Sequence, residues 1–258
     1  MLLAIDIGNT NTMVGVFDAD KLLFHFRVAS ALSLTVDEAG LFVSSLFNHH
    51  LEAKVSRVSR VAVCSVVPAL TEIYEKMTRK YFKVEPLTIK SDVKLPITID
   101  YPNPAEIGAD RLANAAAGYA HLHKAVIVVD LGTAITFDIV SDSGTYLGGV
   151  IAPGVQTAAA NLAHRAARLF EVRVEKPRHI IGKSTAEALK SGLFYGTVGI
   201  IDHVLERIFE ESGRKSAVLA TGGDAETFCS DSKYIQEIIP TLTLDGIRLI
   251  ADCNSKKS

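Results

Sequence analysis

Short apolar runs separated by polar turns dominate the first part of the chain. The runs at 2–7, 12–18 and 22–29 are rich in Val, Ile, Leu and Phe, which predicts three short strands with a hairpin turn at 18–21. Apolar positions then recur at helical spacing over 35–51. Beyond this helix the pattern predicts a buried strand over 60–66, a helix over 68–81, a strand over 84–89, irregular structure over 95–104 and a helix over 109–123.

The same order of elements begins again near residue 125. Strands are expected over 125–130, 135–140 and 145–151, helices over 155–169 and 185–211, a strand over 216–220, further helix beyond it and a frayed end over 254–258. A unit of three strands followed by helices and strands therefore occurs twice. We expect an α/β fold of two duplicated lobes around a nucleotide cleft, with residues 1–121 as the N-terminal lobe and 122–258 as the C-terminal lobe.

The amino-acid composition excludes several classes of protein. Of the 258 residues, 48% are hydrophobic and 22% are charged, so the chain can bury a large core without disulfides. Its three cysteines are scattered and form no C-x-x-C pair, which favours a reducing cytoplasm over a disulfide framework or a zinc knuckle. The net charge of −2, without a basic stripe, argues against nucleic acid as a partner. We expect neither a signal peptide nor a membrane span, because the N-terminus lacks a basic region and no apolar run reaches about 18 residues.

The first strand ends in a turn with the sequence Asp6-Ile-Gly-Asn-Thr-Asn-Thr12. Gly8 lacks the Cβ that would keep a phosphate away from the backbone, and the residues after it supply neutral donors. Asp6 cannot bind phosphate favourably, so its expected partner is Mg²⁺ beside the nucleotide phosphates, held directly or through water. The sequence contains no Walker loop. A polar β-turn closed by an Asx-type hydrogen bond is the alternative interpretation.

A matching turn, Asp130-Leu-Gly-Thr133, ends the first strand of the second half. A carboxylate at the end of a buried strand costs free energy unless a cation or donors meet it. A capped turn would explain one such sequence, but two in equivalent places favour nucleotide binding. A third turn, Thr221-Gly-Gly223, follows a later strand, and its glycines would let the backbone pack against a base or a ribose.

The helix predicted from residue 109 begins with the sequence Gly108-Ala-Asp-Arg111. Asp110 lies in its first turn, where free backbone N–H groups and the helix dipole lower the cost of a negative charge. Together with Arg111, it could orient an anion and a hydroxyl group. An ordinary N-terminal acid beside a surface arginine is the alternative.

Taken in order, these motifs resemble those of type III pantothenate kinases, which are similar to the actin, Hsp70 and sugar-kinase ATPase superfamily with ribonuclease H-like lobes. The motif series is D-x-G-N-T at 6–10, Y-x-x-P-x-x-x-G-x-D-R at 101–111, D-x-G-T-A-x-T-x-D at 130–138, G-G-x-I-x-P-G at 148–154 and T-G-G at 221–223. It extends over nearly the whole chain. The implied activity is ATP-dependent phosphorylation of pantothenate to 4′-phosphopantothenate, the first step of coenzyme A biosynthesis.

The resemblance also implies roles for individual residues. The first ATP-phosphate site would comprise Asp6, Ile7, Gly8, Asn9, Thr10, Asn11, Thr12 and Met13, and Thr133 would also contact ATP. The pantothenate site would comprise Tyr101, Gly108, Ala109, Asp110, Arg111 and Thr185, with Asp110 as the general base. ATP would act with Mg²⁺, and Asp130 would bind a monovalent cation, K⁺ or NH₄⁺.

A homodimer is the assembly that the resemblance implies, and one helix supports it. The helix over 185–211 carries apolar residues on more than one face: Leu189, Leu193, Phe194, Val198, Ile200, Ile201, Val204, Leu205 and Ile208. A helix that is apolar on two faces must bury both, against its own lobe and against a further surface. Burial between two elements of one lobe is the alternative.

Two other functions remain open at this point. One is a kinase of the same superfamily that phosphorylates acetate or a sugar, which would keep the fold but not the acceptor contacts at 101–111. The other is a non-catalytic, regulatory ATP-binding protein, because some homologues resemble accessory factors of transcriptional regulators.

Overall fold

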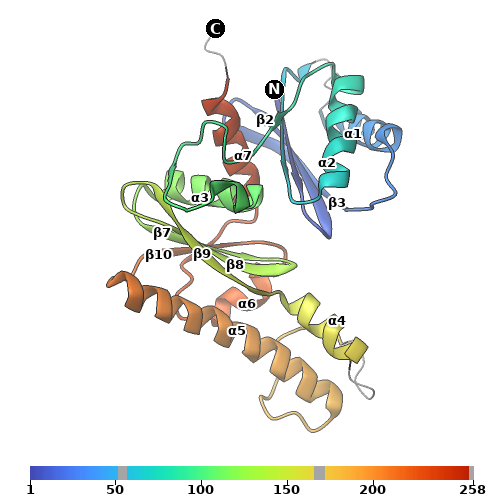
Figure 1. Ribbon diagram of the computed structural model, residues 1–258. Helices are drawn as coiled ribbons and strands as arrows, with labels where there is room; N and C mark the ends of the chain where they lie inside the picture. The colour runs from blue at the N-terminus through green and yellow to red at the C-terminus, as the bar shows by residue number, and fades with distance from the viewer. Residues whose placement is uncertain (52–56, 166–171, 256–258) are drawn as a thin grey trace. The chain divides into compact units, whose positions relative to one another are not determined.

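The computed structural model describes residues 1–51, 57–165 and 172–255. Within them the chain splits into two compact units, which Figure 1 draws with the strands and helices labelled. Unit 1 comprises Met1–Ala120 together with Thr241–Ser258, and unit 2 comprises His121–Pro240. Each unit is built on one β-sheet.

The sheet of unit 1 has the strand order β3-β2-β1-β4-β5. Its strands are β1 (Leu2–Ile7), β2 (Asn11–Asp18), β3 (Lys21–Ala29), β4 (Arg60–Ser65) and the short β5 (Leu87–Thr88). β1 is fully paired, antiparallel with β2 and parallel with β4. The helices α1 (Val36–Leu51) and α2 (Pro68–Met77) pack against each other, and their apolar side chains share one core with the sheet.

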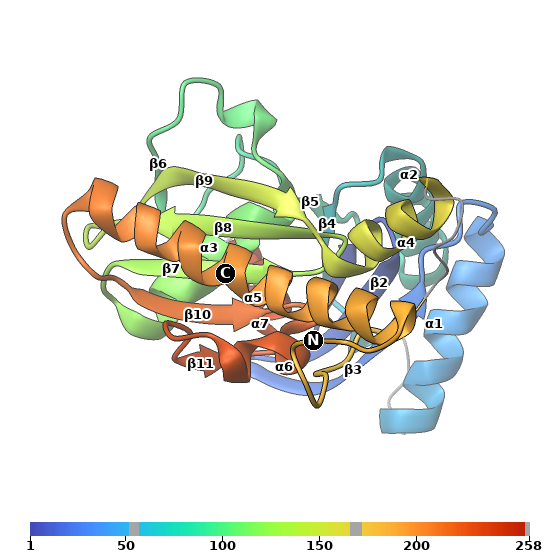
Figure 2. The ribbon, with the colours of Figure 1, turned by 90° about the horizontal axis from the view of Figure 1, so that it is seen from below.

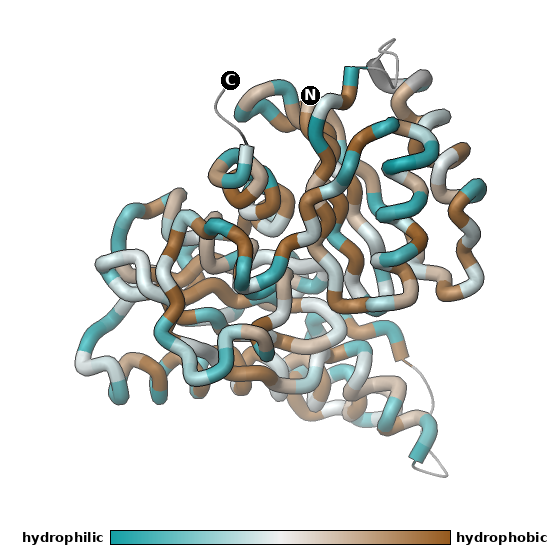
Figure 3. Tube along the Cα trace, turned by 45° about the horizontal axis from the view of Figure 1, so that its top comes forward, coloured by the Kyte–Doolittle hydropathy of each residue, from teal (hydrophilic) through white to brown (hydrophobic). Residues whose placement is uncertain are grey.

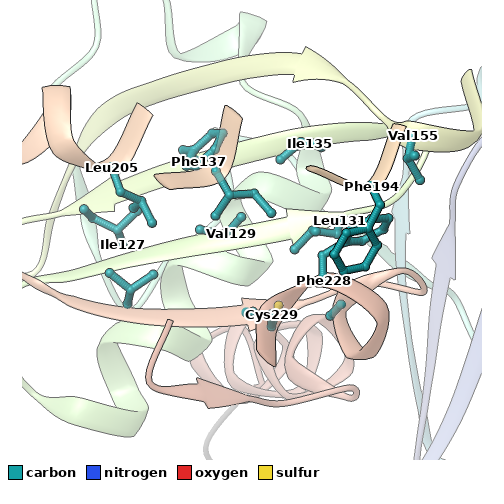
Figure 4. Close-up of a cluster of buried hydrophobic side chains, with 14 of the residues drawn as sticks. Ile127, Val129, Leu131, Ile135, Phe137, Val155, Phe194, Leu205, Phe228 and Cys229 are labelled. Atoms are coloured by element: carbon teal, nitrogen blue, oxygen red, sulfur yellow. The ribbon is translucent and has the colours of Figure 1, made fainter. Parts of the chain in front are cut away.

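The sheet of unit 2 contains β7 (Val126–Leu131), β8 (Ala134–Val140), β9 (Thr145–Pro153), β10 (Ala217–Thr221) and β11 (Glu237–Ile238). These strands follow the order β11-β10-β7-β8-β9. Figure 2 shows the long helix α5 (Thr185–Ser212) running across this sheet. The core beneath it is drawn in Figure 4, where Phe137, Phe194 and Phe228 are three of the large buried side chains. The helices α4 (Val155–Arg165) and α6 (Ala225–Phe228) complete this unit.

The two sheets repeat one topology. In each, a central strand is antiparallel to the next strand in sequence and parallel to a later strand that follows a helical segment. The duplication predicted from the sequence is therefore present in the structure. β1 and β7 are central strands whose two faces are both covered, which explains why their sequences are apolar almost throughout.

The last helix, α7 (Leu242–Cys253), packs against β1, β2 and β4 of unit 1. Figure 3 shows brown and teal stretches alternating along it, next to the C-terminal label, as in an amphipathic helix. Its apolar residues Leu242, Leu244, Ile247 and Ile250 are buried. The sequence-based division placed 122–258 in one lobe, whereas 241–258 here joins unit 1, because the apolar face of α7 is buried on the first sheet.

Between the sheets in sequence lie β6 (Thr98–Ile99), a 3₁₀ turn (Pro104–Glu106) and α3 (Ala109–Leu122). Other boundaries differ from the predicted ones. α2 ends at Met77 and continues as a π-helical turn over Thr78–Phe82, and only Leu87–Thr88 of the strand predicted over 84–89 is paired. The predicted ends at 166–169 and 256–258 lie outside the described residues. In the part of the chain that is described, no helix is both long enough and apolar enough to span a membrane.

Gly246 provides a test of the contact between α3 and α7. A Cβ at this position would lie 2.5 Å from the carbonyl carbon of Ala113, and backbone cannot move away cheaply. We expect Gly246→Ala to lower the free energy of unfolding by about 1–3 kcal/mol through overpacking. The sign of the change in the free energy of unfolding distinguishes overpacking from helix propensity, because propensity alone would raise stability by about 1 kcal/mol. Thermal and urea unfolding measure the change, and a stabilised variant would contradict the close packing.

Candidate active site

The turn between β1 and β2 exposes polar side chains. Asn9, Thr10 and Asn11 are exposed. The N–H group of Gly8 donates to the carbonyl of Asn11 at 3.0 Å, and a Cβ at Gly8 would lie equally close to that oxygen. The glycine therefore keeps the turn tight. Thr12 differs from its neighbours because its side chain is fully buried.

Asp6 and Asp130 occupy equivalent positions in the two sheets. Asp6 is the penultimate residue of β1, paired with Met13 of β2 and Cys64 of β4. Asp130 is the penultimate residue of β7, paired with Thr136 of β8 and Thr221 of β10. Both carboxylates are half-buried. Each sheet therefore carries one acid at the carboxyl end of its central strand, directly before a Gly-containing turn.

The second turn, at 130–133, is hydrogen-bonded to residues at the N-terminal end of α4. The Gly132 N–H group donates to the carbonyl of Ala134 at 3.0 Å, and the Thr133 side chain is exposed. The Thr133 carbonyl accepts two hydrogen bonds, from the Gly154 N–H group at 3.1 Å and from the Thr157 Oγ1 at 2.7 Å. The Pro153-Gly154 motif thus packs directly on the second turn.

The Thr-Gly-Gly turn after β10 packs on the other side of the same segment. Asp224 donates its N–H to the Leu131 carbonyl at 3.0 Å. Gly222 has a φ of +96°, and a Cβ there would lie 2.5 Å from Asp130 Oδ1. Only glycine combines this backbone conformation with such a close approach. Three motifs that are far apart in the sequence, at 130–133, 153–154 and 221–223, therefore form one site in unit 2.

Asp110 lies in the first turn of α3 and is half-buried. One oxygen, Oδ1, accepts a hydrogen bond from the Arg111 N–H at 2.8 Å. Burial raises the pKa of the Asp110 carboxyl above its ordinary value, against the lowering effects of this hydrogen bond and of the Arg111 charge. A Cβ at Gly108 would lie 2.5 Å from Oδ1, so the glycine leaves room for the carboxylate. The Gly-Ala-Asp-Arg motif therefore presents a desolvated carboxylate with elevated proton affinity.

The other predicted acceptor residues lie in both units. Tyr101 is half-buried in the loop before the 3₁₀ turn, and Arg111 is buried at 9% exposure. Thr185 is exposed in the first turn of α5, next to the N-cap residue Ser184, whose hydroxyl accepts from the Glu187 N–H at 3.2 Å. This capping fixes where α5 begins and so where Thr185 is presented.

Sequence reasoning missed two features of the site. The Thr157 hydroxyl donates to the Thr133 carbonyl of the second turn. A single threonine in the first turn of a helix forms no recognisable motif, so the sequence alone could not identify it. Asp138, the last residue of the second motif, had no assigned role. It is fully buried and accepts a hydrogen bond from the Tyr146 hydroxyl at 3.0 Å, which ties β8 to β9.

Among the described residues, no group of three or more His, Cys, Asp or Glu side chains is arranged to hold a metal ion. In nucleotide sites Mg²⁺ is usually held by one or two carboxylates together with phosphates and water rather than by a protein cage. Asp6 fits such a role because it is half-buried directly before the first turn.

Comparison of the sequence with known proteins identifies one matching family. A family model described as type III pantothenate kinase matches residues 2–207. A type III pantothenate kinase from Myxococcus xanthus is 45% identical, over 97% of this chain and 97% of that protein. One from Anaeromyxobacter sp. is 44% identical, over 98% of this chain and 100% of that protein.

Solved structures show the same fold at lower identity. A Baf family transcriptional activator from Campylobacter jejuni has a TM-score of 0.60 at 23% identity, covering 98% of both chains. A ROK family glucokinase from Streptomyces griseus, in complex with glucose and AMPPNP, has a TM-score of 0.55 at 12% identity, covering 97% of this chain and 99% of that one. The expected actin-like ATPase fold is confirmed. From the family match and the near full-length relatives, the chain belongs to the type III pantothenate kinase family.

Proposed function

We propose that this chain transfers the γ-phosphoryl group of ATP to the primary hydroxyl of pantothenate, giving 4′-phosphopantothenate and ADP in the first step of coenzyme A biosynthesis. The observation that carries the proposal is Asp110, a carboxylate of raised pKa at the start of α3, in a chain with two equivalent phosphate turns. Family membership supports the choice of pantothenate as the acceptor.

Asp110 is the general base of the proposed reaction. Its carboxylate accepts the proton of the pantothenate hydroxyl while that oxygen bonds to the γ-phosphorus. The bond from the γ-phosphorus to the bridging oxygen of the β-phosphate breaks, and ADP leaves with the electron pair. Burial supports this role, because a carboxylate of raised pKa is a stronger proton acceptor than an exposed one.

The two turns are the proposed binding sites of the ATP phosphates. In unit 1 the site comprises the segment Asp6–Met13, whose exposed amides and hydroxyls are neutral donors. In unit 2 it comprises Thr133, exposed on a turn that Gly154 and Thr157 hold in place. Mg²⁺, bound at Asp6, would neutralise phosphate charge in the transition state. The protein's contribution is mostly positioning, which is what phosphoryl transfer requires.

Pantothenate is the proposed ligand of a second group of residues: Tyr101, Gly108, Ala109, Asp110, Arg111 and Thr185. Arg111 suits the carboxylate of pantothenate, because a guanidinium can donate two parallel hydrogen bonds to it. Gly108 supports the assignment, since it leaves room for the Asp110 carboxylate.

A monovalent cation, K⁺ or NH₄⁺, is the proposed ligand of Asp130. Asp130 Oδ1 and the Leu131 carbonyl oxygen both lie beside Gly222. A carboxylate oxygen and a carbonyl oxygen are therefore close together at this point. Oxygen ligands of this kind suit hard cations. A cation there would offset the negative charge of ATP close to a half-buried acid.

A coupled ADP-release assay with pantothenate, acetate and glucose as acceptors tests the function. We expect turnover with pantothenate only, and a fall in kcat of about 10²–10⁴ in Asp110→Asn, the scale of losing a general base. Turnover with glucose or acetate would identify another kinase of the superfamily. ATP binding without turnover on any acceptor would favour a regulatory protein. An Asp110→Asn enzyme with wild-type kcat would remove Asp110 from the mechanism.

The pH dependence provides a control on the same residue. Activity requires ionised Asp110, so it is lost as pH falls through a pKa raised above the ordinary value of 3.8. Because the folded-state pKa is raised, ionisation of Asp110 costs stability once pH exceeds its unfolded pKa. Asp110→Asn should therefore not lower the melting temperature at pH 7. A variant that melts well below the wild type would mean that lost activity reflects lost structure.

The cation proposal is tested by replacing K⁺. We expect activity in K⁺ or NH₄⁺ buffers, weak activity in Na⁺, and an Asp130→Ala variant that is inactive or no longer responds to the cation. Steady-state rates at constant ionic strength measure this, with Asp142→Ala as a control at an exposed acid of unit 2. Equal wild-type rates in Na⁺ and K⁺ would contradict a specific site.

A homodimer is the proposed assembly, and the cytoplasm the proposed compartment. One face of α5 packs on its own sheet through Leu193, Phe194, Ile201 and Leu205. The opposite face carries exposed Gly192, Gly196 and Gly199, where an added Cβ would meet nothing within 4 Å, and Ile200 at 37% exposure. This face of small residues would let the same helix of a second chain approach closely, as a two-fold interface requires.

Gly196→Arg tests the assembly. The substitution meets open space within the chain, so the fold should persist, whereas a charged side chain would block a helix contact. We expect light scattering to show a dimer for the wild type and a monomer for the variant. Glu211→Arg, exposed at the C-terminal end of α5 and away from Gly196 along the helix, should remain dimeric. A monomeric, fully active wild type would disprove the proposal.

A further inference from the structure

We infer that the hydroxyl groups of Thr12 and Ser30 form a directional hydrogen-bond chain, joined to the core residue Tyr74, that ends on the Gly8 carbonyl and positions the first phosphate turn for ATP. The inference rests on the proposed function, because it assigns positioning residues to one of the proposed ATP sites. Tyr74 and Ser30 belong to none of the motifs that identified the family.

The contacts run from the core to the turn. Ser30 Oγ donates to the Gly8 carbonyl at 2.7 Å, and it lies 2.9 Å from Thr12 Oγ1. The Tyr74 side chain is hydrogen-bonded to Thr12 in turn. The Ser30 backbone N–H also donates to the Thr10 carbonyl at 2.9 Å, so one residue binds two carbonyls of the turn.

Counting protons fixes the direction of the chain. Ser30 has a single hydroxyl proton, which it donates to Gly8, so Thr12 must donate to Ser30. Thr12 therefore uses its own proton on Ser30. Burial raises the pKa of the Tyr74 phenol above its ordinary value, so Tyr74 meets Thr12 as a neutral hydroxyl. Aligned hydroxyls of this kind strengthen one another.

The chain is anchored in rigid structure at its inner end. Tyr74 belongs to α2 and is 3% exposed, within the apolar core that α1, α2 and the sheet share. Thr12 is the second residue of β2 and is fully buried. The position of the turn is therefore set by the core rather than by the exposed side chains around it.

Peptide geometry links this chain to phosphate binding. The C=O and the following N–H of a trans peptide point in opposite directions. Since the Gly8 carbonyl is directed at Ser30, the N–H of Asn9 is directed the opposite way. The hydroxyl chain thus removes an oxygen that would repel phosphate and orients an N–H donor in its place. The Thr12 hydroxyl is engaged in the chain, so Thr12 would serve the proposed ATP site by positioning the turn.

The second half of the molecule has an independent counterpart. Thr157 Oγ1 donates to the Thr133 carbonyl at 2.7 Å, the same length as the bond from Ser30 to Gly8. A hydroxyl from outside each turn therefore holds one of its carbonyls. The two hydroxyls come from unrelated places, the end of a strand in unit 1 and the first turn of a helix in unit 2.

The test compares Ser30→Ala, Ser30→Thr and Tyr74→Phe with the wild type. The Kd of ATP is measured by calorimetry, and the KM values of both substrates by steady-state kinetics. We expect Ser30→Ala to weaken ATP binding about three- to tenfold, the scale of one lost hydrogen bond, with the KM of pantothenate unchanged. Ser30→Thr should restore the Kd, and Tyr74→Phe should give a smaller loss. Ser45→Ala is the matched control, since it removes a 2.9 Å hydroxyl-to-carbonyl bond from α1 away from the turn.

The outcomes separate this inference from the proposed function. A folded Ser30→Ala chain with wild-type Kd for ATP would overturn the positioning role and leave the kinase intact. If ATP binds the wild type but pantothenate is not phosphorylated, the proposed function fails, while the weakened Kd of Ser30→Ala still supports the chain. Loss of melting temperature without a selective change in ATP binding would make the three hydroxyls structural only. A wild type that does not bind ATP would overturn both.

Discussion

The pairing of one strand with an antiparallel and a parallel neighbour determines where the candidate site residues of each half lie. β1 and β7 are hydrogen-bonded on both edges, and their apolar side chains are buried by the elements packed on the sheet. Such a strand can expose polar groups only where it ends. Asp6 and Asp130 stand at that point, and the turns that follow are where the backbone leaves the sheet and its N–H groups become available to a ligand.

Much of the fold could be predicted from the sequence, because the strands and helices of both halves follow the local pattern of apolar runs and polar turns. The alternation of apolar runs and turns predicted β1, β2, β3, β7, β8 and α5 to within a few residues. The return of α7 to the first sheet did not follow, because periodicity identifies an amphipathic helix but not the surface that covers its apolar face. The strand predicted over 84–89 is paired only at β5, because an apolar sequence indicates a strand but not how many of its residues meet a partner strand.

The site was only partly predictable. Glycine, acid and hydroxyl patterns located both turns and Asp110, because each of these residues has a local reason to be where it is. The residues that hold the turns could not be found this way. Ser30 directly follows β3 and Tyr74 lies in α2, and only the folded structure brings their hydroxyls to Thr12. The sequence also does not reveal that Gly154 and Gly222 have no room for a side chain. Their close neighbours include backbone atoms of Gly132, Thr133 and Leu131, which only the fold brings near them.

The discontinuity of unit 1 has a consequence for biosynthesis. A ribosome makes the chain from its N-terminus, so residues 1–120 emerge long before α7. Until residues 241–253 have been made, the surface of β1, β2 and β4 that α7 covers stays open to solvent and to other apolar chains. Unit 2 is continuous in sequence and can complete its own core first. The sheet of unit 1, made before unit 2, is thus the last to close, and the nascent protein depends on α7 to bury it.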